Sequence, residues 1–149
     1  MTQIENVLAG RYASSEMVDL WSARHKVVLE RQLWVAVLSA QADLGVAVPD
    51  GVIAAYEAVV HEVDLASIDE RDRSPRHDVK ARIDEFCALA GHEHIHKGMT
   101  SRDLTENVEQ LQLRAGLELV RERAVAALVR LGQRAAQYSD LAIAGRSHN

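Results

Sequence analysis

The feature that most constrains this fold is the stretch from Ser101 to Tyr138, which contains no proline and keeps a helical period. Apolar residues spaced three and four apart indicate one amphipathic helix. Thr100 and Asp103 resemble a capping box, in which each side chain accepts a hydrogen bond from the other residue's amide. At about 1.5 Å per residue the helix would be roughly 50 Å long. Such a helix is longer than a small globule needs, so we expect it to protrude.

The apolar residues of this helix form two neighbouring seams. The first consists of Leu104, Val108, Leu111, Ala115 and Leu119, and the second of Leu117, Val120, Ala124, Leu128 and Leu131. A protruding helix with wide apolar faces must bury them against other subunits or further chain. The alternative is a simple bundle that folds back on itself.

Shorter helices are expected before the long one. Alanine, leucine, glutamate and arginine favour helix, and two prolines and eight glycines leave little room for turn-rich β structure. We expect a short helix capped by Ser14 or Ser15, and others over 23–44, from Pro49-Asp50 onward, over 64–73 and over 78–90. The predicted fold class is therefore all-α. An N-terminal helical domain (1–100) would precede the first long helix of a helical bundle (101–149).

Charge and composition exclude several classes of protein. The formal charge of −5 gives no reason to propose a nucleic acid or an anionic membrane as partner. The single cysteine, Cys87, excludes an internal disulfide, fits a reducing compartment and is expected in the core. No stretch approaches 18 uninterrupted apolar residues, and the N-terminus has no signal-peptide pattern. A soluble, cytoplasmic protein is expected.

Two polar segments suit anion binding. Arg11-Tyr12 could grip a phosphate with a guanidinium and stack a phenol on a purine. Arg76-His77-Asp78 begins a helix, where free amides attract anions, His77 can titrate near neutrality and Asp78 can cap or orient it. Each segment can also be read as ordinary surface: an exposed pair, and a helix cap beside a solvated histidine.

Histidines and hydroxyls gather before the long helix. His92, His94 and His96 alternate as zinc ligands on an extended strand would, but no cysteine or second ligand cluster lies nearby. We expect accidental alternation with one functional histidine, and neither metal nor cofactor. Thr100 and Ser101, at the mouth of a long helix, form a better cradle for a carboxylate or phosphate.

The last residues carry another polar segment. Residues 141–144 are expected to be short, extended and buried, and Gly145-Arg146-Ser147-His148-Asn149 follows them. Histidine is the usual proton donor or acceptor at neutral pH, although His148 can also be read as a simple polar terminus. A well-marked motif in this position leads us to expect a truncated chain.

In their order along the chain, four segments resemble the adenylosuccinate lyase family of the fumarase and aspartase superfamily. They are residues 11–17 with Trp21-Ser22, Arg76-His77-Asp78-Val79, residues 96–101 with Asp103, and Gly145-Arg146-Ser147-His148. The resemblance covers nearly the whole chain. Arg11-Tyr12 together with Arg76-His77-Asp78-Val79 is typical of this branch of the superfamily.

The resemblance implies cleavage of a C–N bond by β-elimination, releasing fumarate from adenylosuccinate and from a related imidazole carboxamide of purine synthesis. It implies that His148 is the general acid for the departing nitrogen and that His77 assists it. The implied substrate-binding residues are Arg11 and Tyr12 at the nucleotide end, Arg76, His77 and Asp78, Thr100 and Ser101 on a succinyl carboxylate, and His96 near the phosphate or base.

Two departures from the family pattern are present. The family's catalytic base is a serine in a Ser-Ser-x-Met-Pro-x-Lys-x-Asn loop, which this sequence lacks, and Asn149 stands where glycine often follows the histidine. The family forms homotetramers whose sites are shared among three subunits. The resemblance thus implies an N-terminal portion that is inactive alone. The alternatives are a sister lyase acting on argininosuccinate, fumarate or aspartate, and a stand-alone helical interaction module.

Overall fold

The computed structural model describes residues 6–73 and 77–148, and within them it is helical without strands. The helices are α1 (Val7–Tyr12), α2 (Ser15–Leu20), α3 (Ala23–Asp43), α4 (Val52–Ala58), α5 (Leu65–Asp72), α6 (Asp78–Ala90) and α7 (Ser101–Gln137). The predicted all-α class is confirmed. No helix in the described part of the chain is both long and apolar enough to cross a bilayer.

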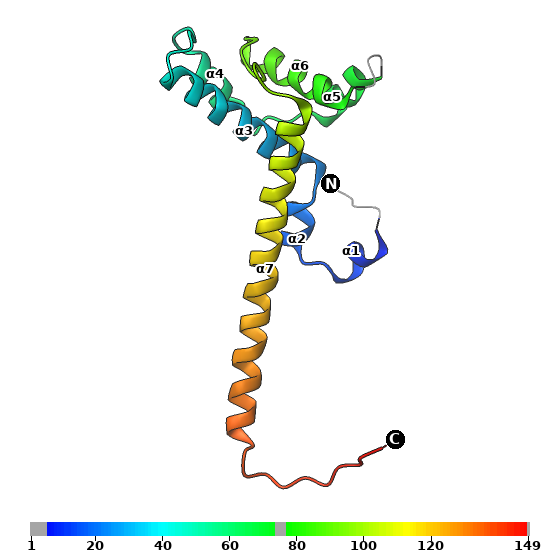
Figure 1. The fold of residues 1–149 in the computed structure, drawn as a ribbon. Helices are drawn as coiled ribbons and strands as arrows, with labels where there is room; N and C mark the ends of the chain where they lie inside the picture. The colour runs from blue at the N-terminus through cyan, green and yellow to red at the C-terminus, as the bar shows by residue number, and fades with distance from the viewer. Residues whose placement is uncertain (1–5, 74–76, 149) are drawn as a thin grey trace.

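Helices α3 to α6 gather into a head at one end of the molecule, and α7 extends from it as a stalk (Figure 1). The 37 residues of α7 correspond to about 55 Å. The predicted capping box is confirmed: the Thr100 amide donates to Asp103 Oδ2 at 2.7 Å, and the Asp103 amide donates to Thr100 Oγ1 at 3.4 Å. Helices α1 and α2 lie beside the stalk, and the chain ends beyond its far end (Figure 1).

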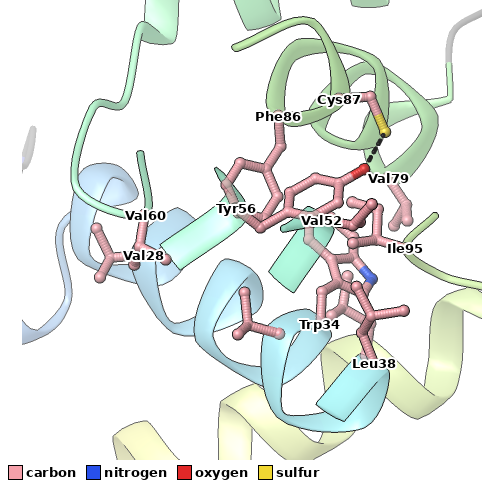
Figure 2. Packing of buried hydrophobic residues seen from close by; sticks show 12 residues of the cluster. Val28, Trp34, Leu38, Val52, Tyr56, Val60, Val79, Phe86, Cys87 and Ile95 are labelled. Atoms are coloured by element: carbon pink, nitrogen blue, oxygen red, sulfur yellow. Dashed lines mark hydrogen bonds between the residues drawn. The ribbon is translucent and has the colours of Figure 1, made fainter. Parts of the chain in front are cut away.

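The core of the head is aromatic at its centre. Phe86 of α6 lies 4.9 Å from the Tyr56 ring of α4 and 6.2 Å from the Trp34 ring of α3, measured between centroids. Figure 2 shows the apolar residues around these rings, with the Tyr56 hydroxyl against Cys87. Cys87 is buried in this core, as predicted, and Leu104 of α7 is fully buried there too. The first turn of the stalk therefore belongs to the head.

A buried ion pair ties α3 to α6. Arg31 and Glu85 are paired, with their side chains 0% and 2% exposed. Arg31 also donates to the carbonyls of Val59 and Val60 at 2.8 and 3.1 Å, and Glu85 Oε1 accepts from the Asp64 amide at 3.2 Å. These partners satisfy most of the polar atoms of the pair, which a buried ion pair requires.

Two local expectations need correction, and one alternative is decided. The helix expected from Pro49-Asp50 begins at Val52, because Gly51 takes a left-handed φ of 82° and turns the chain first. Of the two serines expected as caps of α2, Ser14 is the cap and accepts from the Met17 amide at 3.4 Å. Residues 141–144 are exposed rather than buried, since no described part of the chain covers them.

The buried residues of α7 are spaced four apart and form one row along the helix. Leu104, Val108, Gln112 and Gly116 are buried, whereas Leu111, expected in the first seam, is 45% exposed. The row ends in a polar and a small residue because α2 crosses there: Gln112 Nε2 donates to the Leu20 carbonyl at 2.9 Å. The second seam is uncovered in this chain, with Leu117, Leu128 and Leu131 65–71% exposed.

Candidate functional site

A groove of about 610 Å³ lies where the N-terminal ends of α6 and α7 meet. Its lining brings together four residues that the sequence analysis assigned to the site, from two separate segments: His77, His96, Thr100 and Ser101. The lining consists of His77, Val79, Lys80, Ile83, His96, Met99, Thr100 and Ser101. Two helix N-termini with histidines and hydroxyls at their edges suit a ligand that carries anionic groups.

His77 is itself the N-cap of α6. Its Nδ1 accepts from the Lys80 amide at 3.2 Å, so in this state the ring proton is on Nε2. Of the two roles expected for Asp78, capping the helix is excluded, because Asp78 is its first residue. The exposed His77 ring can thus offer an N–H to a ligand while it holds the helix end.

Asp78 lies beside the groove lining and is tied to the core through Arg82. Arg82 Nη2 is 3.0 Å from Asp78 Oδ2, and Arg82 Nε is 2.6 Å from the fully buried carboxylate of Glu30. Partial burial is the largest single influence and opposes ionisation of Asp78, but the Arg82 guanidinium, the Val79 amide and His77 together lower the pKa of Asp78. Burial raises the pKa of Glu30 even though Arg82 opposes this. Arg82 therefore holds the start of α6 against α3.

His96 enters the groove from the loop between α6 and α7. Its Nδ1 accepts a hydrogen bond of 3.0 Å from Trp34 Nε1, and its backbone has a φ of 62°. Burial lowers the pKa of His96; the Asp103 carboxylate opposes this shift and His77 adds to it. At neutral pH the ring is therefore an uncharged donor through Nε2.

The loop that carries His96 is fastened to the head by side chains. Tyr56 Oη donates to the His92 carbonyl at 2.6 Å and accepts from the His94 amide at 3.1 Å. Gln41 Nε2 donates to the Lys97 carbonyl at 2.9 Å. The position of His96 thus depends on α3 and α4 as well as on its own loop.

Thr100 and Ser101 have different capacities. The capping box occupies both the hydroxyl and the amide of Thr100, whereas the Ser101 hydroxyl takes no part in it. Hydrogen bonds from Thr100 lower the pKa of Asp103, which keeps that carboxylate ionised in the first turn. The Thr100 hydroxyl only accepts in this box and can still donate, so the Ser101 hydroxyl is the less committed of the two rather than the sole one open to a ligand.

Three other residues that the sequence analysis assigned to the site lie elsewhere in the single chain. Arg11 and Tyr12 end the short helix α1, and Tyr12 lines a second groove of about 340 Å³ with Val120 and Arg123. His148 is exposed beyond the far end of α7. Arg76 lies outside the described residues.

The alternating histidines show no arrangement of metal ligands. The rings of His92 and His94 are 6.4 Å apart, and His94 Nδ1 lies 3.5 Å from Lys97 Nζ. In residues 6–73 and 77–148, no group of three histidine, cysteine, aspartate or glutamate side chains could hold a metal ion.

Lys80 and Trp34 are among the residues of this site that sequence reasoning missed. Lys80 lines the groove and is paired with Asp84 one turn further along α6. Its spacing of three from His77 puts both on one helix face, a signal that could have identified it. Trp34 had no such signal, since it lies 62 residues before the histidine it contacts.

Comparison with known proteins identifies similar chains. No family model matches the sequence. The chain is 32% identical over 98% of its length to an adenylosuccinate lyase of Schistosoma mansoni, covering 31% of that protein. It is 33% identical over 95% of its length to one of Schizosaccharomyces pombe, covering 30% of it. A trans-aconitate decarboxylase of Mycosarcoma maydis is 27% identical over 95% of the chain, which covers 29% of that protein.

The chain thus spans about 30% of the length of the curated relatives it matches. The resemblance to adenylosuccinate lyases, which four short segments predicted, is confirmed over nearly the whole chain.

Proposed function

We propose that this chain is part of a lyase that cleaves adenylosuccinate to AMP and fumarate, and that also acts on the related imidazole carboxamide of purine synthesis. The similarity to adenylosuccinate lyases supports it. So does the groove, which gathers His77, His96, Thr100 and Ser101 from two of the family-like segments. Residues 1–100 would form the N-terminal domain and residues 101–149 the start of the central bundle.

The chemistry of the substrate fits the groove. Adenylosuccinate carries a phosphate and two carboxylates, so its site needs several anion-binding groups. In the proposal the Ser101 hydroxyl and the first amides of α7 hold a succinyl carboxylate, since a helix N-terminus favours anions. Lys80 adds a positive charge, and His77 and His96 each offer an N–H.

Proton transfer to the departing nitrogen is assigned to His148, with His77 assisting. A histidine suits this step because it gains and loses a proton near neutral pH. The family's serine base is absent from these 149 residues. We therefore expect them to release no appreciable fumarate by themselves.

The proposed site needs more than one copy of the chain. His148 and the Arg11-Tyr12 segment lie away from the groove along a stalk of about 55 Å. The exposed apolar residues of that stalk, including Leu117, Leu128 and Leu131, suit helix packing between copies. We propose a homotetramer in the cytoplasm, in which other subunits supply the distant residues.

The test is fumarate release by the full-length gene product that contains this chain. Adenylosuccinate would be compared with argininosuccinate and malate by fumarate release, and with trans-aconitate by release of carbon dioxide, because decarboxylation forms no fumarate. We expect activity on adenylosuccinate that His148→Ala abolishes and Ser101→Ala strongly reduces. Ser139→Ala is the matched control, because the exposed Ser139 hydroxyl donates only to the Ala136 carbonyl, at 3.2 Å.

Two other functions remain as alternatives, and the same panel separates them. Turnover of another substrate would keep the groove but assign a sister reaction; the similarity to a decarboxylase makes trans-aconitate an informative arm. Inactivity on all four substrates would favour a helical interaction module that docks through α7.

A further inference from the structure

We propose that Trp34 is a positioning residue that holds His96 as the neutral tautomer with its proton on Nε2. Trp34 lies behind the groove and is not among its lining residues, whereas His96 is. Trp34 would therefore act on a ligand only through the histidine. The tautomer itself is independent of the proposed function; its consequence for substrate rests on that function.

The contact between the two rings is direct. Trp34 Nε1 lies 3.0 Å from His96 Nδ1, and the rings meet edge to face at 87°, with centroids 5.9 Å apart. An indole nitrogen can only donate, so Nδ1 must carry a lone pair. The single proton of the neutral imidazole is then on Nε2.

The surroundings disfavour the other protonation states. Trp34 is 1% exposed, so a proton on Nδ1 would leave its buried indole N–H facing another donor. The titratable groups that act on His96 are Asp103 on α7, which favours its cation, and His77 at the start of α6, which opposes it. Lys80 lines the same groove and is paired with Asp84.

The backbone of the loop also constrains the position of the His96 ring. A φ of 62° at His96 is uncommon for a residue with a side chain, and such conformations persist where the surroundings fix them. The Tyr56 and Gln41 hydrogen bonds on either side supply that constraint. Loop and indole together fix where the imidazole sits and which nitrogen bears the proton.

The consequence is a specific role for His96. A neutral ring with Nε2–H donates to an acceptor such as a phosphate or carboxylate oxygen. Its Nδ1 is occupied, so it cannot accept a proton there without breaking the tryptophan contact. His96 would bind an anionic oxygen of adenylosuccinate, and His148 and His77 would be left to move protons.

The test is NMR on the 149-residue chain with ¹⁵N-labelled histidine and tryptophan, without substrate. We expect a His96 spectrum with the proton on Nε2, and a Trp34 indole N–H signal that moves as His96 is titrated. In Trp34→Phe the proton-binding constant of His96 should rise roughly threefold or more, because the donor that favours the neutral ring is gone. Trp21→Phe, which removes a 43% exposed indole, should leave His96 unchanged.

A proton on Nδ1 of His96 in the unaltered chain would overturn the proposal, whether or not any variant folds. An unchanged His96 titration in a folded Trp34→Phe chain would overturn it as well. Neither result depends on lyase activity. Failure of the proposed function is thus distinguishable from failure of this inference.

Discussion

Replacing Tyr56 with phenylalanine would remove a single oxygen from the centre of the head. That oxygen donates to the His92 carbonyl at 2.6 Å, accepts from the His94 amide at 3.1 Å and lies 3.3 Å from Cys87 Sγ. The Tyr56 side chain is 0% exposed, so water cannot readily replace these partners. Phenylalanine keeps the ring against Phe86, and the change therefore isolates the hydroxyl.

The magnitude follows from the two backbone groups left behind. A typical hydrogen bond contributes about 0.5–1.5 kcal/mol net, and a buried group without a partner costs about 1–3 kcal/mol. His92 and His94 are partly buried, so the lower part of each range applies. We expect Tyr56→Phe to lower the free energy of unfolding by about 2–3 kcal/mol.

Urea unfolding followed by far-UV circular dichroism measures this loss, and the urea dependence should stay unchanged. Tyr138→Phe is the matched control, because the 47% exposed Tyr138 bonds only the exposed Arg134 at 3.2 Å. The control should change stability by less than about 0.5 kcal/mol. A loss of that small size in Tyr56→Phe would refute the view that this hydroxyl fastens the His96 loop.

Three further predictions concern other parts of the molecule. Arg31→Met should cost about 3–5 kcal/mol in urea unfolding, because buried Glu85 loses its partner; if the double variant with Glu85→Met recovers nothing, the pair is not the cause. Gly132→Ala should raise helix stability by about 0.5–1 kcal/mol, since no atom lies within 4 Å of the added methyl group. A lower thermal midpoint would show that another helix occupies this space. Because the pKa of His96 is lowered on folding, its contribution to stability is present above pH 6.5, its ordinary pKa, and is lost as the pH falls through the folded value. His96→Gln should flatten that part of the stability profile, and an identical profile would contradict the assignment.

The helices that the sequence predicted best are those whose ends are marked by local chemistry. Thr100 with Asp103 marks the start of α7, and Gly91, with a φ of 72°, marks the end of α6. The start of α4 was misplaced because proline is typical of a first helical turn, yet Gly51 reverses the chain after it. A local sequence pattern predicts a helix end correctly when residues at that end form the hydrogen bonds or the turn that close it.

The site was predictable only in part, for the same reason. His77, His96 and Ser101 stood out by type and spacing, but their convergence depends on how the loop returns to α6. Trp34 and Arg82 act through contacts that no sequence period reveals, since each depends on the packing of α3 against its neighbours. The prediction that Leu111 is buried was wrong, because the packing of α2, and not the helical pattern, decides which row of α7 is buried.

The contact between α2 and the stalk has a consequence for the order of events during synthesis. The Gln112 side chain meets the Leu20 carbonyl across 92 residues of chain. Ribosomes add about 5–20 residues per second, so α2 exists for roughly 5–20 s before its partner is made. During that time α7 cannot cover the apolar side of α2. Helix α2 is thus made well before the contact that fixes it to the stalk can form.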